Sequence, residues 1–531
     1  MGQTQRKIVV FTGALDYPVR KGIVEIDEAN PGLTWLVLLH KPTKTLHQLV
    51  RNQIVNLRRN GWRWIPYQLA DLWRRRTSHG SRRESHRGPG APFSEDALRR
   101  RPNVHLLQVS DIHASTSIAA VRDFDADLGL SLAAPILRRA LFSLPRLGTI
   151  NLHKGKLPEF RGMPPAFWEV WHDQKSVGCS VHCVDDRLDT GDLIVETSVP
   201  RARHSTVRGL QLQLDEVGIE LTAEATRNLL AGRAVPRAQP TGQGTTHRKP
   251  TLSQQAALRR AVMQPGSLAA VSRRLLKDGR AATLCGLYRA GGGRMLTPRI
   301  TVLLYHRVSD EVRDNLTVGI EQFERQMAIL AQACDVVPIE QVLAASVIPR
   351  SPRPLVAVTF DDGYVDNFVN AVPILRRHDI PAAFFVATGI VDSDRRFPHD
   401  VRRGNPAIPV MRWEQLRTMH RWGFTIGSHT VNHIDCASEP EEVVRDELER
   451  SRDTLRAELG VAEPILAYPY GGRLNMTPQR LQLVRAAGYV GCLSAYGGAN
   501  VGKVDRFNVL RRGISHEFSD RTFRLECLGV L

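Results

Sequence analysis

Two separate series of short apolar segments run along the chain, and each series has the pattern of a parallel β-sheet. The segments are rich in Val, Ile, Leu and Phe, and stretches of helical or loop character separate them. Strands that are buried on both faces have this continuous apolar pattern. The first series comprises residues 7–11, 34–40, 104–109 and 127–132, and the second comprises residues 300–306, 355–360, 382–387 and 424–429. The pattern predicts two α/β domains.

The length of the chain, 531 residues, also favours two domains over one ordinary core. We place the first domain at residues 1–255 and the second at residues 297–531. Between them, residues 256–296 are rich in Ala, Arg and Leu with helical character but carry no motif, so we expect a linker there. No internal repeat relates the two halves.

A basic insertion is expected within the first domain, at about residues 42–103. From Arg51 to Arg101 the sequence has thirteen arginines against four acidic residues, and this segment contributes much of the formal net charge of +18. Its first half has apolar residues at helical spacing, which predicts a basic amphipathic helix pair, and residues 77–94 have the composition of a loop. Two interpretations remain open: a solvated helical insertion that packs on its own domain, or a surface for an anionic membrane or substrate.

Several classes of protein are disfavoured by composition. No stretch approaches the roughly 18 apolar residues that a membrane-spanning helix needs, and the N-terminal apolar run is too short for the core of a secretory leader. The seven cysteines are odd in number and form no C-x-x-C pair, which argues against a disulfide framework and a thiolate zinc site. We therefore expect a cytoplasmic protein, with peripheral membrane association as the open alternative.

Residues 150–194 carry a distinctive constellation. It combines an Asn-x-His pair, a Leu-Pro followed by Arg-Gly, and a Leu-Asp-x-Gly turn, formed by Asn151, His153, Leu157, Pro158, Arg161, Gly162, Leu188, Asp189 and Gly191. In this order and spacing the segment resembles the folate-dependent formyltransferases, which act on glycinamide ribonucleotide, methionyl-tRNA or amino sugars. The resemblance implies an open Rossmann-like domain that uses 10-formyltetrahydrofolate as its formyl donor.

The resemblance also implies a catalytic set. Formyl transfer to an amine develops an oxyanion and releases a proton, so the site needs hydrogen-bond donors and a base. Asn151 would donate to the oxyanion, His153 would accept the proton or stabilise charge, and Asp189 would orient His153. Leu157, Pro158 and Gly162 would bind the folate, and His182 is a secondary candidate for lining the site.

A second constellation lies in the C-terminal half. TFDDG at 359–363, SHTVNH at 428–433 and YPYG at 468–471 together resemble the polysaccharide deacetylases, which have a deformed (β/α) barrel. The resemblance implies that Asp362, His429 and His433 bind a divalent metal and that Asp361 is the general base. A His-x-x-x-His pair suits a divalent metal, because residues four apart face one way in a helical turn. Zinc is the expected metal, with manganese, cobalt and nickel left open.

Two features depart from the deacetylase pattern. Ala467 stands where an arginine usually precedes the proline of the third motif, and no clear Leu-x-His element supplies a general acid. His516 is the nearest candidate for that acid, and His306 is a further candidate pocket residue. The backbone N–H of Tyr470 is a candidate oxyanion donor.

The combination predicts a bifunctional enzyme that remodels the N-acyl group of an amino sugar. It would hydrolyse an N-acetyl or N-formyl amide and formylate a primary amine. Because formyl folate is cytoplasmic, the expected partner is a nucleotide-linked or lipid-linked amino sugar. An alternative is a methionyl-tRNA-type formyltransferase with a degenerate carbohydrate-binding C-terminal domain. The short linker leaves no room for the tRNA-binding barrel of that family, so nucleic acid is the less favoured partner.

Overall fold

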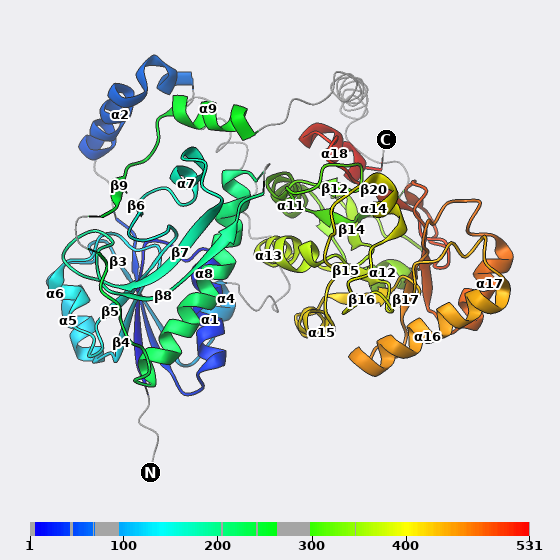
Figure 1. Ribbon diagram of the computed structural model, residues 1–531, viewed down its shortest axis with the longest axis horizontal. Coiled ribbons are helices and arrows are strands. Elements are labelled where there is room, and N and C mark those ends of the chain that lie inside the picture. The colour runs from blue at the N-terminus through cyan, green and yellow to red at the C-terminus, as the bar shows by residue number, and fades with distance from the viewer. Residues whose placement is uncertain are drawn as a thin grey trace, which may run out of the picture. The chain divides into compact units, whose positions relative to one another are not determined.

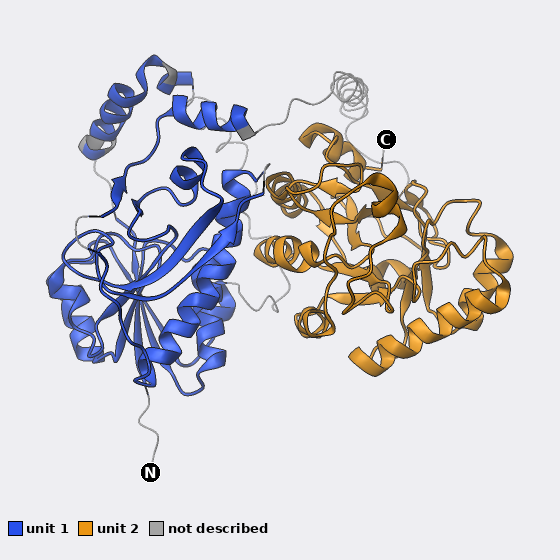
Figure 2. Ribbon diagram, in the orientation of Figure 1, with its two compact units in different colours: residues 1–264 blue, residues 265–531 orange. Residues whose placement is uncertain are grey.

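The computed structural model describes residues 6–42, 46–66, 68, 95–202, 205–240, 243–262, 298–345 and 347–529. The chain forms two compact units, residues 1–264 and 265–531 (Figure 2). Each unit is built on its own β-sheet with helices packed against it (Figure 1). Among the described residues, none of the helices combines the length and apolarity needed to cross a bilayer.

Unit 1 contains a seven-stranded sheet of order β3-β2-β1-β4-β5-β7-β8. The strands from β3 to β5 are parallel, whereas β7 and β8 form an antiparallel pair at one edge. The strands of this sheet are β1 (Lys7–Thr12), β2 (Thr34–His40), β3 (Val104–Val109), β4 (Leu128–Ser131), β5 (Thr149–His153), β7 (Ser176–Cys183) and β8 (Leu193–Pro200). A small second sheet pairs β6 (Phe160–Gly162) with β9 (Thr245–His247).

Alternating side chains of β1 enter two cores, one on each face of the sheet. Ile8 and Val10 belong to one core, and Val9 and Phe11 to the other. The helices of this unit are α1 (Tyr17–Ala29), α2 (Leu46–Asn60), α4 (Glu95–Arg99), α5 (Ser115–Phe124), α6 (Arg139–Phe142), α7 (Phe167–Trp171), α8 (Val207–Leu230) and α9 (Leu252–Val262). The Rossmann-like α/β architecture expected from the sequence is confirmed.

The insertion and the linker differ in part from expectation. Helix α2 confirms helical structure in the first half of the insertion, followed by the 3-10 turn η1 (Gly61–Arg63), whereas the loop predicted at 77–94 lies outside the described residues. Helix α9 runs through the predicted linker boundary at 255/256 because Leu258 is buried in the core of unit 1. The rest of the predicted linker, 263–296, also lies outside the described residues.

Unit 2 is built on a curled nine-stranded sheet of order β18-β17-β16-β15-β14-β10-β19, with β13 beside β14 and β20 beside β10. Its strands are β10 (Arg299–Tyr305), β13 (Asp335–Val336), β14 (Leu355–Phe360), β15 (Ala382–Val386), β16 (Thr425–Ser428), β17 (Ile465–Ala467), β18 (Gly491–Leu493), β19 (Asn500–Val501) and β20 (Arg511–Gly513), and β11 (Arg307–Val308) pairs separately with β12 (Thr317–Val318). A bridge joins Leu493 of β18 to Val509, just before β20, so pairing continues round from β18 to β10. This confirms a deformed barrel.

Helices surround this sheet and place the ends of its parallel strands at a common edge. They are α11 (Ile320–Ala333), α12 (Ile339–Ala344), the π-helical turn η2 (Asn367–Ala371), α13 (Val372–Arg377), α14 (Pro398–Arg403), α15 (Trp413–Arg421), α16 (Glu441–Leu459), α17 (Pro478–Ala486) and α18 (Asp520–Cys527). Because β14, β15, β16 and β17 are parallel, the loops that follow them lie together.

Candidate active sites

The first site lies where β5 and β7 run side by side in unit 1. Asn151 and His153 are on β5, and His182 of β7 is the direct cross-strand partner of Asn151. Asp189 comes from the loop between β7 and β8 and has a positive φ of 55°. The structure thus brings together the three residues of the predicted catalytic set and adds His182 to them.

Hydrogen bonds fix the orientation of both imidazoles. His182 donates from Nδ1 to the carbonyl of Cys183 at 2.8 Å, which leaves Nε2 to accept from the Asn151 amide at 3.1 Å. His153 donates from Nε2 to the carbonyl of Phe160 at 2.8 Å. Its other nitrogen, Nδ1, faces Oδ2 of Asp189 at 3.4 Å. A proton taken up at His153 Nδ1 would therefore lie against a carboxylate.

The protonation states follow from burial and from these contacts. Burial lowers the pKa of His153 more than the neighbouring carboxylate of Asp189 raises it. Burial alone would raise the pKa of Asp189, but contacts from His182 and His153 and the Gly162 N–H outweigh it and lower that pKa. The arrangement therefore favours a neutral imidazole beside an ionised carboxylate.

Gly162 connects this set to the loop predicted to bind folate. Its N–H donates to Oδ2 of Asp189 at 3.0 Å. It has a φ of 88°, and a Cβ at this position would lie 2.3 Å from the carbonyl oxygen of His247, so only glycine fits without strain. Gly162, Asn151, His153, His182 and Asp189 all line a cavity of about 730 Å³. Leu157 and Pro158, by contrast, are buried and are not among its lining residues.

The lowered pKa of His153 predicts a pH-dependent contribution to stability. An unfolded histidine titrates near 6.5, so below that pH the unfolded chain binds more protons at this position than the folded chain. The free energy of unfolding should therefore rise with pH between the lowered folded pKa and 6.5. Urea unfolding across this range should show a shallower rise in His153→Gln than in the wild type; an equal slope would contradict the assignment.

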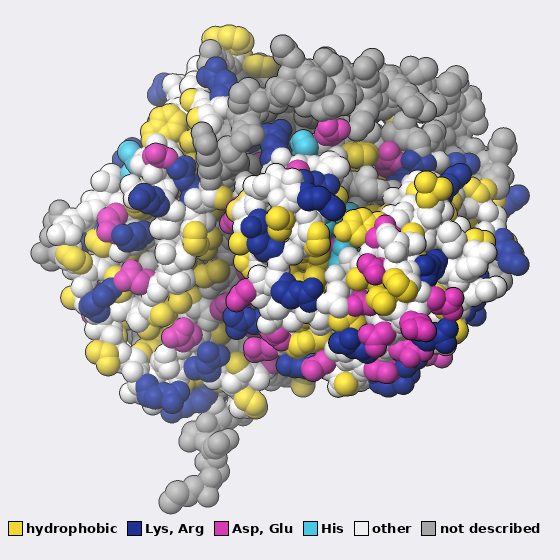
Figure 3. Space-filling view, turned by 45° about the vertical axis from the view of Figure 1, so that its right-hand side comes forward, with side chains coloured by type: hydrophobic (Ala, Val, Ile, Leu, Met, Phe, Trp, Pro, Cys, Tyr) yellow, Lys and Arg dark blue, Asp and Glu magenta, His cyan; other side chains and the backbone are white. Residues whose placement is uncertain are grey.

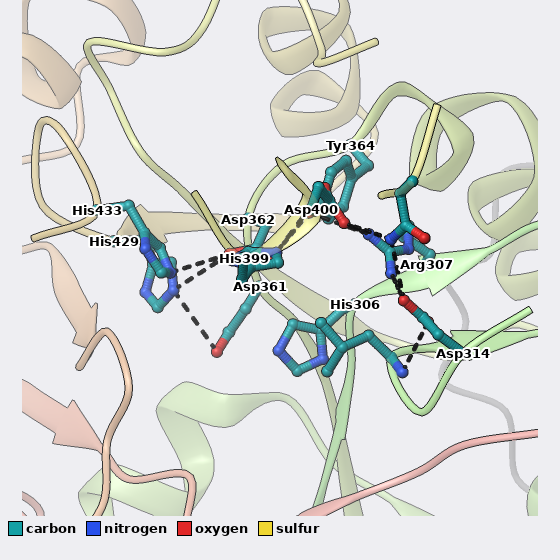
Figure 4. Close-up of polar contacts among 12 residues, drawn as sticks. His306, Arg307, Asp314, Asp361, Asp362, Tyr364, His399, Asp400, His429 and His433 are labelled. Carbon is teal, nitrogen blue, oxygen red and sulfur yellow. Dashed lines mark hydrogen bonds and ion pairs between the residues drawn. The ribbon is translucent and has the colours of Figure 1, made fainter. Parts of the chain in front are cut away.

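The second site lies at the strand ends of unit 2. Asp361 and Asp362 follow β14, while His429 and His433 flank the turn after β16. One ligand atom from each of Asp362, His429 and His433 lies within 4.8 Å of the others, and all three residues are buried. Figure 4 shows both imidazoles directed at the two carboxylates. The Nε2 atoms of His429 and His433 lie 3.5 and 3.3 Å from Oδ1 of Asp362.

The two histidines do not lie in a helical turn, and that part of the sequence argument was wrong. Thr430 and His433 have positive φ angles of 62° and 57°, which an α-helix excludes. The turn is held instead by Glu447 of α16, whose Oε2 accepts from the backbone N–H groups of Val431 and Asn432 at 2.9 and 2.8 Å. A buried carboxylate on a neighbouring helix thus aligns the histidines.

The donor set fits a divalent cation. His429 donates from Nδ1 to the carbonyl of Ala467 at 2.7 Å, which leaves the Nε2 lone pair facing Asp362. Asp362 is only 3% exposed, and its Oδ2 has no hydrogen-bond partner. The Nδ1 of His433 is likewise buried without one. A cation between one carboxylate and two imidazoles would compensate the buried negative charge.

Asp361, the predicted general base, pairs with Arg511, which the sequence did not predict. Its guanidinium forms two parallel hydrogen bonds of 2.7 Å with the carboxylate of Asp361, and the arginine is completely buried. Arg511 stands on β20, 150 residues from Asp361 in sequence, so the fold and not a local motif brings the two together.

Replacing Arg511 is expected to destabilise the protein strongly. In Arg511→Met the Asp361 carboxylate would remain buried without its partner, at a cost of about 3 to 5 kcal/mol. Arg450 on α16 pairs with Asp446 at 2.9 Å and both side chains are exposed, so Arg450→Met should cost about 1 kcal/mol or less. Urea unfolding measures the free energy of unfolding of the two variants. Equal decreases would show that the pair with Asp361 stabilises the protein no more than the other pair does.

Three further residues of unit 2 were predicted to belong to the site: His306, Tyr470 and His516. His306 follows β10, and burial lowers its pKa, while Asp362 and Asp361 act to raise it. The ring of Tyr470 lies 4.9 Å from that of His433. His516 instead donates from Nδ1 to the backbone carbonyl of Asp314 at 2.8 Å, and none of its described polar contacts reaches Asp361 or Asp362.

A buried polar network behind Asp362 was not anticipated. His399 of α14 approaches Oδ2 of Asp362 at 3.5 Å, and its Nε2 lies 2.8 Å from the hydroxyl of Tyr364. Tyr364 donates to Asp400 at 2.7 Å, and Asp400 pairs with the completely buried Arg307 (Figure 4). No sequence motif marks His399, because the fold alone brings α14 to this strand end.

Comparison with known proteins identifies both units. The family model for formyl transferase matches residues 78–226, and that for polysaccharide deacetylase matches residues 349–491. A methionyl-tRNA formyltransferase from Citrifermentans bemidjiense is 31% identical over 137 residues, which is 26% of this chain and 43% of that protein. The chain thus spans less than half the length of that curated relative.

Two solved structures resemble the chain in fold. The Streptococcus pyogenes deacetylase PplD, in complex with acetate, is 24% identical and covers 44% of this chain and 99% of its own, with a TM-score of 0.37. A Mycobacterium tuberculosis protein described as a likely sugar N-formyltransferase is 14% identical and covers 49% of this chain and 88% of its own, with a TM-score of 0.30. By its two family matches, the chain is a fusion of a formyl transferase domain with a polysaccharide deacetylase domain, both of them enzyme families.

Proposed function

We propose that the protein remodels the N-acyl group of an amino sugar, removing an acetyl or formyl group at one site and adding a formyl group at the other. The observation that carries this proposal is the presence of two separate polar constellations in one chain. One surrounds Asn151, His153 and Asp189, and the other surrounds Asp361, Asp362 and the histidine pair. Both chemistries act on the amide of a primary amine, so one substrate class could serve both.

In the deacylase unit, Asp362, His429 and His433 would hold the cation. Such a cation polarises an amide carbonyl and acidifies water. Asp361 lies beside the cluster, 4.0 Å from Nε2 of His429, where it could accept a proton from the attacking water. Arg511 keeps its carboxylate ionised and oriented. Zinc suits one carboxylate and two imidazoles best, and manganese, cobalt and nickel are alternatives.

In the transferase unit, the 730 Å³ cavity would receive 10-formyltetrahydrofolate and the acceptor amine. The Asn151 amide has two hydrogens; one is used on His182, and the other could donate to the formyl oxygen as negative charge develops there. His153 would take the proton released by the amine at Nδ1, where Asp189 stabilises it. Gly162 would let the folate loop approach closely.

The acceptor is proposed to be a nucleotide-linked or lipid-linked amino sugar in the cytoplasm. The polysaccharide deacetylase match of unit 2 favours a carbohydrate acceptor, because both units could then act on the same class of substrate. The relatives named methionyl-tRNA formyltransferases make initiator tRNA the alternative acceptor, and their match covers only the N-terminal part of this chain.

The test is an acyl-group assay with the full chain loaded with zinc, manganese, cobalt or nickel. N-acetylated and N-formylated nucleotide sugars, their free amines, and methionyl-tRNA are each incubated with and without 10-formyltetrahydrofolate, and products are identified by mass spectrometry. Loss of an acyl group from sugars and folate-dependent formylation of sugar amines would support the proposal. Formylation of methionyl-tRNA alone, with no sugar altered, would overturn it.

A further inference from the structure

Helix α2 exposes an apolar stripe. Val50, Ile54 and Leu57 are spaced so that they share one face of the helix, and their side chains are 50%, 46% and 41% exposed. Trp62 and Ile65, just after the helix, are 74% and 53% exposed. Apolar side chains of this size rarely cluster on a free surface unless the surface binds something.

All the charged side chains of α2 are basic. Arg51, Arg58 and Arg59 are exposed, and Leu46–Asn60 contains no acidic residue. Within the described part of the chain, no acidic side chain pairs with these three arginines. We call the five apolar residues and the three arginines the α2 surface. Figure 3 shows hydrophobic and basic side chains near one another at the top of unit 1, the end at which Figure 1 places α2.

The α2 surface is tied to unit 1 at the end of the helix. Asn60 accepts from the backbone N–H of Leu252, at the start of α9, at 3.0 Å. Trp64 donates from its indole to Gln53 at 2.9 Å, which folds the chain after the helix back onto it. The helix is thus held on the unit while its apolar stripe remains exposed.

We propose that the α2 surface docks the protein on an anionic lipid bilayer. A membrane-surface helix lies in the interface with its apolar face in the acyl boundary and its arginines against anionic headgroups. Exposed tryptophan suits this boundary, because its ring is apolar and its N–H is polar. The uncompensated positive charge selects an anionic lipid surface over the apolar face of another protein. The inference rests on the α2 surface alone and not on the proposed reaction.

The test is sedimentation of the full chain with phosphatidylcholine vesicles that contain or lack phosphatidylglycerol, without sugar or folate. We expect binding only to the anionic vesicles, weakened by salt. Each arginine near such a surface contributes about fivefold, so the variant with Arg51, Arg58 and Arg59 replaced by Gln should bind about a hundredfold more weakly. Replacing Val50, Ile54 and Leu57 with Ser should weaken binding at least ~10-fold.

A matched control lies on α16 in unit 2. Val443 is 41% exposed, and Arg445 and Arg450 pair with Glu441 and Asp446. The variant Val443→Ser, Arg445→Gln, Arg450→Gln should bind vesicles as the wild type does, and circular dichroism confirms folding of all variants. Absence of wild-type binding, or equal binding by the α2 variants, would overturn the inference. So would light scattering in which the apolar variant alone converts a dimer to a monomer, since a second copy would then cover the stripe.

Discussion

His429→Ala is expected to abolish tight binding of a divalent cation and to lower amide hydrolysis by unit 2 by about a thousandfold. A site of one carboxylate and two imidazoles cannot keep its geometry after the loss of one imidazole. The cation that polarises the amide carbonyl lowers the activation free energy of hydrolysis by several kcal/mol, and this contribution would be lost. Cation affinity is measured by competition with a chromogenic chelator, and hydrolysis by product mass.

His420→Ala is the matched control for this variant, because His420 is an exposed histidine on α15. It should retain both cation affinity and hydrolysis. The formyl transfer activity of His429→Ala should also equal that of the wild type. Cation binding that survives in His429→Ala would mean that the cluster of Asp362, His429 and His433 is not the binding site.

The second large effect is expected for Asn151→Ala, which should lower formyl transfer by about 10²- to 10³-fold. The substitution removes the amide donor proposed for the developing oxyanion, and such donors typically contribute this much. It also leaves Nε2 of His182 without the donor that it has in the wild type. Transfer is followed as release of tetrahydrofolate at saturating amine.

Amide hydrolysis in the same Asn151→Ala preparation is its internal control and should be unchanged. A fall in both activities would point to a global folding defect, and a folding check by urea unfolding distinguishes this case. Wild-type formyl transfer in a folded Asn151→Ala protein would remove Asn151 from the catalytic set.

The residues of the two constellations could be predicted from the sequence because each motif that carries a family resemblance is short, although the motifs of one constellation lie far apart in the chain. Asn151 and His153 are two residues apart on one strand and so lie on the same face of the sheet, and Asp361 and Asp362 follow a continuous apolar strand. Strand alternation and strand ends explain why these side chains share a face or an edge of the sheet, whereas the family resemblances assign their roles.

The partners that orient these residues could not be predicted, because the fold brings them from distant segments. Arg511 reaches Asp361 only because β20 pairs with β10, and Glu447 supports the histidine turn from a separate helix. His399 stands on the short helix α14 with no motif around it. The helical spacing assumed for His429 and His433 was wrong because two positive φ angles, stabilised by tertiary contacts, overrode local propensity.

One chain is proposed to carry two separate sites for the N-acyl group of an amino sugar. The most direct measurement incubates an N-acetylated sugar nucleotide with ¹³C-formyl-labelled 10-formyltetrahydrofolate and follows the acyl group by mass spectrometry in the wild type, Asn151→Ala and His429→Ala. We expect exchange of acetyl for labelled formyl by the wild type, arrest at the free amine in Asn151→Ala, and intact acetyl in His429→Ala. A wild type that neither releases acetyl nor formylates the free sugar amine, or a single variant that loses both activities while folded, would contradict it.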